Sequence, residues 1–294
     1  MALPPPSEDQ AFCTVSALEA GHLNLPDHLF ITNAEPNKIT RAPSLSFLLT
    51  HSSRPDKIVF DLGIRRDWEN YPPAAVRFLQ RASFDVPQNV VESLEKGGLV
   101  PGDIDTVCIS HCHWDHVGDA EPFANATFVL GGESQALIES GYPTNPDSFY
   151  SAHVVPLDRT RFLDERTPWT TLGPFPRALD FYGDGSLYVV DAPGHLPGHI
   201  NVMARTSKDG GWVCLAADSA HHCKLLTGEA EIATGAHVFG PSGCAHEDKA
   251  GAEAQLGIIK SLRTDPRVRV VLAHDSTFER EHPEAFWPGK IASL

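Results

Sequence analysis

The chain has 294 residues, of which 41% are hydrophobic and 21% are charged. This composition predicts one globular domain over residues 1–294 with a sizeable core. Its 38 acidic residues outnumber 23 basic ones, for a net charge of −15, which disfavours nucleic acid as a partner. No apolar stretch approaches the roughly 18 residues of a membrane span, and residues 1–10 lack a basic, apolar leader. We therefore expect a cytoplasmic protein with no membrane partner.

The first third of the chain alternates between irregular and strand-like patterns. Residues 1–12 are rich in proline and are expected to be poorly ordered. Residues 45–50 and 57–60 are apolar runs joined by a polar turn, which predicts a β-hairpin. Residues 64–88 combine aromatic residues with two adjacent prolines, which predicts a loop and a short helix. We expect this segment to cover a pocket.

A helix and two strands are predicted next. Residues 89–97 have helical spacing and end at a glycine. Residues 105–110 and 126–130 are short apolar runs typical of buried strands, and residues 134–140 favour a helix. Residues 143–176 are predicted to be irregular and form a second candidate pocket cover.

The last third is predicted to be mainly strand. Residues 187–190, 199–206 and 211–216 have strand patterns, the last two joined by a Lys-Asp-Gly-Gly turn. Residues 249–262 have the pattern of an amphipathic helix, and residues 268–272 that of a buried strand. The alternation of helices and strands predicts the α/β class.

Metal-ligating side chains follow directly after the predicted strand 105–110. The segment from His111 to His116 reads His-Cys-His-Trp-Asp-His. In an extended loop, His111 and His113 point to the same side and can bind one ion, while Asp115 and His116 turn towards a second. Further histidines and aspartates follow later predicted strands. The sequence therefore predicts a metal site at one edge of a sheet.

These motifs, in this order, resemble those of the metallo-β-lactamase superfamily. They are His111-Cys-His-Trp-Asp-His116, Ala192-Pro-Gly-His-Leu-Pro-Gly-His199, Asp218 and His274-Asp275. The resemblance implies an αβ/βα four-layer sandwich, in which two mixed sheets are flanked by helices and the metals lie at one edge. Within the superfamily the chain is most similar to N-acyl homoserine lactone lactonases.

By position, the resemblance implies seven metal ligands. They are His111, His113 and His199 for the first metal, Asp115, His116 and His274 for the second, and Asp218 as the bridging carboxylate. His195 is then expected to stabilise its loop through hydrogen bonds. The ligand set suits two Zn²⁺ per chain, although Mn²⁺, Fe²⁺ and Co²⁺ accept the same donors.

These ligands predict a dinuclear hydrolase acting on a small molecule. Metal coordination lowers the pKa of water from about 15.7 to about 7, so a metal-bound hydroxide can attack a carbonyl at neutral pH. Asp115 is also predicted to be catalytic, because a carboxylate there can hold the attacking water and pass its proton to the leaving group. The expected reaction is the opening of a cyclic ester (lactone) or a cyclic amide (lactam).

One position departs from the lactonases. Those enzymes have a tyrosine three residues after the bridging aspartate, whereas this chain reads Asp218-Ser-Ala-His221. The imidazole of His221 can donate the hydrogen bond that the tyrosine supplies. We therefore predict a catalytic role for His221, and the departure leaves the natural substrate open.

Three alternative functions are left open by the residues. The first is a thioesterase of acyl-carrier or CoA esters, since the same hydroxide attacks thioesters. The second is a mononuclear iron enzyme of the sulfur dioxygenase type, and the third is an inactive metal-binding scaffold. A homodimer is also left open. Histidines without a ligand partner at characteristic spacing are predicted to lie on the surface or in loops: His22, His28, His51, His153, His237, His246 and His282.

Overall fold

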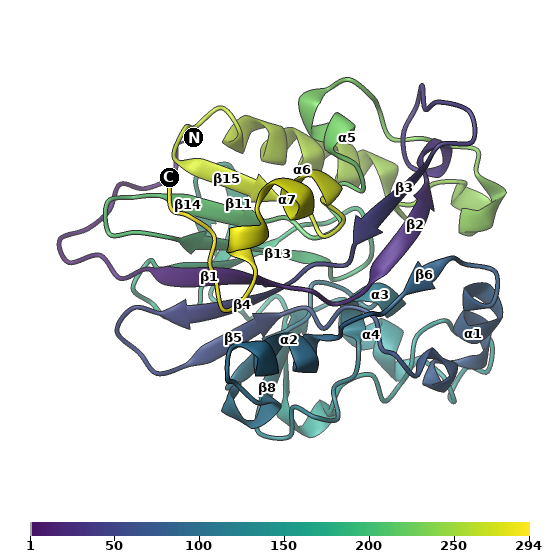
Figure 1. The fold of residues 1–294 in the computed structure, drawn as a ribbon, viewed down its shortest axis with the longest axis horizontal. Coiled ribbons are helices and arrows are strands. Elements are labelled where there is room, and N and C mark those ends of the chain that lie inside the picture. The colour runs from purple at the N-terminus through teal and green to yellow at the C-terminus, as the bar shows by residue number, and fades with distance from the viewer. Residues whose placement is uncertain (1) are drawn as a thin grey trace.

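Three β-sheets form the frame of the molecule in the computed structural model, which describes residues 2–294 and, at residues 240–242, the backbone alone. The first sheet has the strand order β1 (Cys13–Leu18), β4 (Ser46–His51), β5 (Lys57–Phe60), β7 (Thr106–Cys108), β8 (Thr127–Gly131) and β9 (Thr160–Leu163). The second has the order β10 (Thr170–Leu172), β11 (Phe175–Asp180), β12 (Leu187–Asp191), β13 (Ile200–Arg205), β14 (Trp212–Leu215) and β15 (Val268–Val271). The third has the order β3 (Ile39–Pro43), β2 (His22–Pro26) and β6 (Phe84–Asp85), and lies at one end of the molecule (Figure 1).

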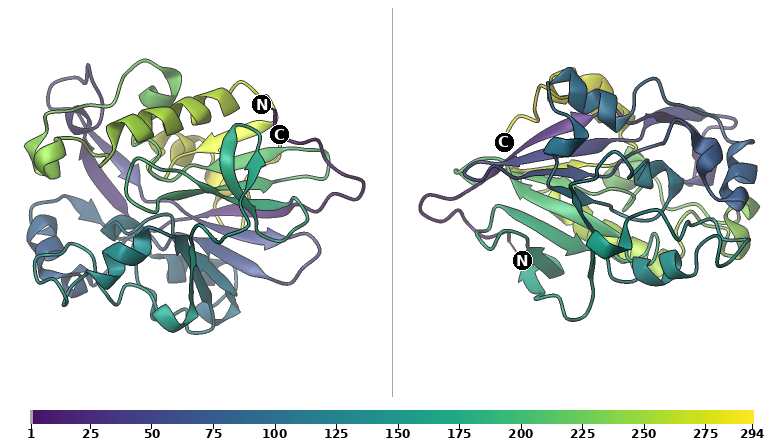
Figure 2. Two further views of the ribbon diagram at one scale, coloured as in Figure 1. Left: turned by 180° about the vertical axis from the view of Figure 1, so that it is seen from behind. Right: turned by 90° about the horizontal axis from the view of Figure 1, so that it is seen from below.

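Helices lie outside the two large sheets (Figures 1 and 2). On the side of the first sheet are α1 (Pro73–Leu79), α2 (Val90–Lys96), α3 (Trp114–Val117) and α4 (Ser134–Glu139). On the side of the second are α5 (Cys223–Thr227) and α6 (Lys249–Leu262), and α7 (Ser276–Glu281) follows β15. The 3-10 helices are η1 (Asp27–Leu29), η2 (Trp68–Asn70), η3 (Pro101–Asp103), η4 (Leu157–Arg159), η5 (His237–Ser242) and η6 (Pro283–Ala285).

Three layers of apolar side chains hold this arrangement together. Successive side chains of a strand point to opposite faces of its sheet, so each large sheet can pack against its partner sheet on one face and against helices on the other. Phe47 of β4 and Val202 of β13 belong to the cluster between the sheets. Leu48, the next residue of β4, packs instead in the cluster that contains Leu94 of α2. The result is a four-layer αβ/βα sandwich.

Several predicted elements are confirmed. The predicted hairpin is β4 and β5, which pair antiparallel with Phe47 opposite Phe60. The helix predicted at residues 249–262 has those bounds as α6, and Asp248 caps it by accepting the N–H of Gly251. The helix predicted at residues 89–97 is α2, which begins at a capping box.

Two segments differ from expectation. Residues 143–176 were predicted to be irregular, but they contain β9, β10 and the start of β11. These strands lie at or near sheet edges, where few apolar residues are needed to hold them. Residues 2–12 were expected to be poorly ordered, yet Leu3 is buried in the core and Arg205 donates to the carbonyls of Pro4 and Pro5 at 3.0 Å each. Local sequence gave no signal for this long-range packing.

The strand directions bring several loops to one edge of the sandwich. In the first sheet β5, β7 and β8 are parallel, so the loops after β5 and β7 leave at the same end. In the second sheet β14 and β15 are parallel, and Asp218 and His274 follow them. The candidate ligands lie at this edge. Within residues 2–294, no helix is long and apolar enough to cross a bilayer.

Candidate metal centre

Three histidine nitrogens and one carboxylate oxygen form a first cluster at this edge. His111 Nε2 lies 2.9 Å from His113 Nδ1 and 3.1 Å from His195 Nε2. His195 Nε2 lies 3.0 Å from His113 Nδ1 and 3.3 Å from Asp218 Oδ2. A tetrahedral Zn²⁺ with Zn–N bonds of about 2.0–2.1 Å spaces its nitrogens by roughly 3.3 Å. The four donors thus fit around one cation with small adjustments.

His199, which was predicted as the third ligand of this cluster, lies outside it. Its Nδ1 donates to the carbonyl of Ala192 at 2.8 Å, and its Nε2 accepts the backbone N–H of Asp218 at 3.3 Å. Both ring nitrogens are therefore occupied by backbone groups. The structure reverses the expected roles: His195 supplies a nitrogen to the cluster, and His199 supports the loop that carries Asp218.

The position of His195 depends on the glycine before it. Gly194 has φ +124°, which L-residues with side chains rarely adopt, and a Cβ there would lie 2.1 Å from the backbone nitrogen of Ala252 in α6. The carbonyl of Gly194 accepts the N–H of Asp248 at 2.9 Å, and the carbonyl of His195 accepts that of Glu247 at 3.0 Å. The loop is thereby held against the start of α6 with the imidazole turned into the cluster.

A second cluster consists of Asp115, His116 and His274, and it shares Asp218 with the first. Asp218 Oδ1 lies 3.4 Å from His116 Nε2 and 3.3 Å from His274 Nε2. Asp115 Oδ2 lies 3.8 Å and 3.4 Å from the same two nitrogens. Because Oδ2 of Asp218 faces the first cluster and Oδ1 the second, this carboxylate is placed to bridge two cations.

Two buried polar atoms in the clusters have no hydrogen-bond partner, which bears on whether the clusters can hold cations. His116 Nε2 and Asp218 Oδ1 are both buried without a hydrogen-bond partner. Leaving a buried donor or acceptor unpaired costs about 1–3 kcal/mol, so such atoms call for a partner. Imidazole nitrogens and carboxylate oxygens are ligands of divalent transition metals. The donor set therefore fits a divalent metal centre.

Asp61 orients two of the ligands and was not predicted as a site residue. Its carboxylate accepts from His116 Nδ1 at 2.8 Å and from the hydroxyl of Ser110 at 2.7 Å. Because that hydroxyl gives its hydrogen to Asp61, it accepts from His111 Nδ1 at 2.9 Å. Both histidines thus carry their proton on Nδ1 and present the Nε2 lone pair to the clusters. His274 is oriented likewise, through its Nδ1 and the carbonyl of Pro43 at 2.8 Å.

Burial sets the charge of the first-cluster histidines. It lowers the pKa of His113 to about 4 and holds the pKa values of His111 and His195 well below their usual range. These rings are therefore neutral at pH 7, as metal ligands must be. In the second cluster burial alone also lowers the pKa of His116 and His274, but Asp218 and its neighbouring carboxylates raise both above the usual value. A bound cation favours the neutral form there.

His221, the predicted catalytic histidine, lies beside the clusters. Its Nε2 is 3.1 Å from Asp218 Oδ2, and the ring stacks on that of His274 at 6.0 Å. His246 was predicted to be an ordinary loop residue, but its ring lies 4.9 Å from that of His221 and 5.1 Å from that of His195. It is 1% exposed, and burial lowers its pKa to about 2. No ligand-like spacing marks it in the sequence.

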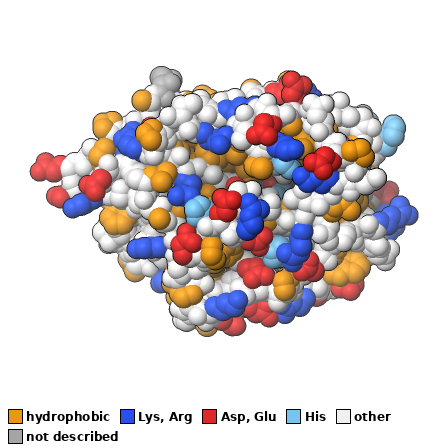
Figure 3. All heavy atoms as spheres, turned by 45° about the horizontal axis from the view of Figure 1, so that its top comes forward, with side chains coloured by type: hydrophobic (Ala, Val, Ile, Leu, Met, Phe, Trp, Pro, Cys, Tyr) orange, Lys and Arg blue, Asp and Glu red, His pale blue; other side chains and the backbone are white. Residues whose placement is uncertain are grey.

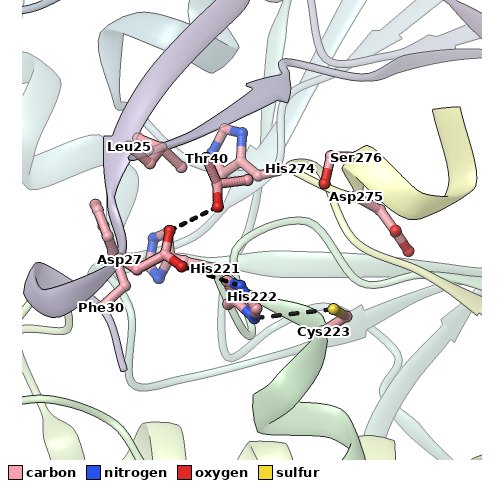
Figure 4. A pocket seen from close by; sticks show the side chains of 10 residues that line it. All are labelled: Leu25, Asp27, Phe30, Thr40, His221, His222, Cys223, His274, Asp275 and Ser276. Carbon is pink, nitrogen blue, oxygen red and sulfur yellow. Dashed lines mark hydrogen bonds and ion pairs between the residues drawn. The ribbon is translucent and has the colours of Figure 1, made fainter. Parts of the chain in front are cut away.

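Behind His221 and His274 lies a small pocket with a polar wall (Figure 4). Asp27 there accepts a hydrogen bond from Thr40 Oγ1 at 2.6 Å, and its Oδ2 lies 3.7 Å from His222 Nε2. These contacts connect the loop after Asp218 to the β2 and β3 hairpin. We assign them a structural role.

A larger cavity of about 1230 Å³ opens over both clusters. His113, Asp115 and Asp218 line it, together with His195, His221 and His274. Both segments predicted to cover a pocket contribute to its walls, since its lining includes residues of 64–88 and of 143–176. Its apolar wall residues include Leu25, Leu29, Phe30, Phe78, Phe149, Val238 and Phe239. A cavity of this size has room for a drug-sized ligand.

Comparisons with known proteins agree with this architecture. The family model described as the metallo-beta-lactamase superfamily matches residues 40–274. The chain is 33% identical over 312 residues to cytochrome P450 monooxygenase mpaDE' of Penicillium brevicompactum, which covers 98% of this chain and 36% of that protein. It is 36% identical over 196 residues to gamma-lactamase FDB1 of Fusarium pseudograminearum (strain CS3096), covering 62% of this chain and 46% of that protein. The chain thus spans less than half the length of either relative.

A solved structure of a quorum-quenching N-acyl homoserine lactone hydrolase has the same fold. It matches with a TM-score of 0.67 and 17% identity, over 95% of this chain and 98% of that one. At that identity the likeness concerns the fold alone. The predicted four-layer sandwich is therefore confirmed.

Proposed function

The chain belongs to the metallo-beta-lactamase superfamily, and on this premise we propose that it is a dinuclear metal-dependent hydrolase that opens a lactone or lactam ring. The observation that carries the proposal is the pair of ligand clusters that share Asp218 at the base of a large cavity. The gamma-lactamase relative supports a cyclic amide as substrate. The lactone hydrolase with the same fold motivates testing the cyclic ester.

The proposed ligands differ from the predicted set at one position. His111, His113 and His195 would hold one cation, Asp115, His116 and His274 would hold the second, and Asp218 would contribute to both sites. Mixed imidazole and carboxylate donors suit two Zn²⁺ per chain, and Mn²⁺, Fe²⁺ and Co²⁺ accept the same donors. When bound, such cations polarise a carbonyl oxygen and lower the pKa of water to about 7.

The chain's own groups supply positioning and proton transfer. Asp115 lines the cavity, with Oδ2 3.4 Å from His274 Nε2, so its carboxylate reaches the place where substrate meets the clusters. We assign it the role of holding the attacking water and passing a proton to the leaving oxygen or nitrogen. His221 lines the same cavity, and we assign its imidazole the role of donating a hydrogen bond to the substrate carbonyl.

Replacing His221 tests its assigned role. In His221→Phe the aromatic ring stays but the donor is lost, and we expect kcat to fall roughly 10²-fold, as when one donor to a developing oxyanion is removed. His221→Tyr restores a donor and should recover part of that loss. His153→Phe makes the same change at an exposed histidine and should have wild-type kcat. Full turnover by His221→Phe, at unchanged metal content, would show that the imidazole is not needed.

A substrate panel tests the proposed reaction. Purified metal-loaded protein is given N-octanoyl homoserine lactone, the corresponding lactam and the octanoyl thioester of N-acetylcysteamine, and kcat/KM is compared. We expect a ring substrate to be preferred and turnover to disappear with a chelator and return with Zn²⁺. A preference for the thioester, or turnover that survives complete metal removal, would contradict the proposal.

A further inference from the structure

Two arginines at the large cavity have no acidic partner. Arg77 lies on α1 and Arg81 follows it by four residues; both are exposed and both line the cavity. Among the described residues, no carboxylate lies within 4 Å of either guanidinium. Two arginines earlier in the same segment form ion pairs, Arg65 with Asp67 at 2.8 Å and Arg66 with Glu92 at 2.7 Å. The positive charge at the cavity is therefore free to meet a ligand.

This local charge contrasts with the rest of the chain. The net charge is −15, and acidic and basic side chains are intermixed over the face drawn in Figure 3. Of the carboxylates that line the cavity, Asp115 and Asp218 belong to the metal clusters. Asp147 and Glu247 also line it, but neither forms an ion pair with the two arginines. An acidic protein that keeps two unpaired arginines at its cavity is suited to an anionic ligand.

Apolar side chains at the same cavity are exposed as well. Ile39 is 59% exposed, Phe149 51% and Val238 52%, and these residues come from three separate segments that all line this cavity. Phe149 packs edge-on against Phe78 with ring centroids 6.2 Å apart, so an apolar wall lies beside Arg77. Exposed apolar surface contributes about 25 cal/mol per Å² when a ligand covers it. The cavity therefore offers apolar contact next to positive charge.

We propose that the substrate of this site has an apolar body with the scissile ring at one end and a carboxylate at the other, and that Arg77 and Arg81 bind this carboxylate. The inference rests on the proposed ring-opening function, which places the ring at the metal clusters. Guanidinium groups form bidentate hydrogen bonds with carboxylates. The two arginines thus select among substrates without touching the reacting atoms.

Two probes that differ only at the far end test this inference. They are N-octanoyl homoserine lactone and its N-(7-carboxyheptanoyl) analogue, which has the same number of acyl carbons and ends in a carboxylate. We expect kcat/KM to favour the carboxylate probe roughly threefold to tenfold, the range for one or two exposed ion pairs. This ratio should fall to about one in Arg77→Gln/Arg81→Gln. Arg161→Gln, which removes an exposed arginine outside the cavity, should keep the wild-type ratio.

A binding measurement separates failure of this inference from failure of the proposed reaction. The ring-opened products of the two probes are titrated calorimetrically into metal-loaded protein, which needs no turnover. The same preference, and its loss in the double variant, support the carboxylate site even if neither lactone is hydrolysed. A wild-type ratio at or below one, or a ratio that the double variant leaves unchanged, overturns the inference even if both lactones are hydrolysed.

Discussion

Asp218→Asn is expected to lower kcat/KM by at least ~10³-fold and to reduce bound metal from two ions per chain to one or fewer. Asp218 is the residue that faces both clusters, with Oδ2 towards His195 and Oδ1 towards His116 and His274. An amide has the shape of the carboxylate but neither its charge nor two equivalent oxygens. Metal polarisation contributes several kcal/mol to such reactions, and about 1.4 kcal/mol corresponds to tenfold in rate.

The control for this variant is Asp209→Asn, which makes the same change at an exposed aspartate in the turn between β13 and β14, at the end of these strands opposite to Asp218. It should keep wild-type activity and metal content. Metal content is measured by atomic emission after weakly bound ions have been removed, and folding is checked by thermal unfolding. Two tightly bound ions in a folded Asp218→Asn protein would contradict the bridging role.

His195→Ala is expected to weaken metal binding, whereas His199→Ala is expected to weaken folding. His195 Nε2 lies 3.0–3.1 Å from the nitrogens of His113 and His111, so its loss should weaken the first metal at least ~100-fold, more than the loss of a group that only contacts a ligand. Activity should fall with it. Within the described part of the chain, the hydrogen bonds of the His199 ring go to the backbone of Ala192 and Asp218, so its loss should mainly reduce the free energy of unfolding, by about 1–3 kcal/mol.

Zinc affinity and unfolding are measured on both proteins in parallel. We expect His199→Ala to bind two ions and His195→Ala to bind one at the same free Zn²⁺ concentration. The reverse result, with the metal lost in His199→Ala and kept in His195→Ala, would restore the assignment made from sequence.

The sequence predicted the fold and the family because their signals are local. The apolar runs before Asp61 and His111, and the helix pattern of residues 249–262, each predict an element without reference to the rest of the chain. The dense motif from His111 to His116 predicted a metal-dependent hydrolase. The match of the metallo-beta-lactamase superfamily model to residues 40–274 confirms the family that this motif indicated, and the hydrolase activity is our proposal.

The choice between His195 and His199 could not be made from sequence. Both follow a Gly in Gly-His-Leu-Pro-Gly-His, and either spacing is compatible with a ligand. The decision depends on which ring nitrogens meet backbone groups in the folded loop. Only the packing of Gly194 on α6 and the N–H of Asp218 at His199 settle where each ring points.

Residues that act through tertiary contacts were also missed. Asp61 lies 55 residues from His116 in sequence, and its role depends on the parallel pairing of β5 and β7. His246 lies in a segment with no periodic pattern, and it reaches the clusters only because α6 begins beside the His195 loop. A signal was present for Asp61, since it directly follows a predicted strand in the sheet that also delivers His111.

The most direct test of the two-metal proposal is a titration of metal-free protein with Zn²⁺ while hydrolysis of the preferred ring substrate is followed. The shared Asp218 and the two clusters around it predict that two equivalents bind and that full activity appears only as the second site fills. Full activity at one equivalent, or no activity when two are bound, would contradict the dinuclear account.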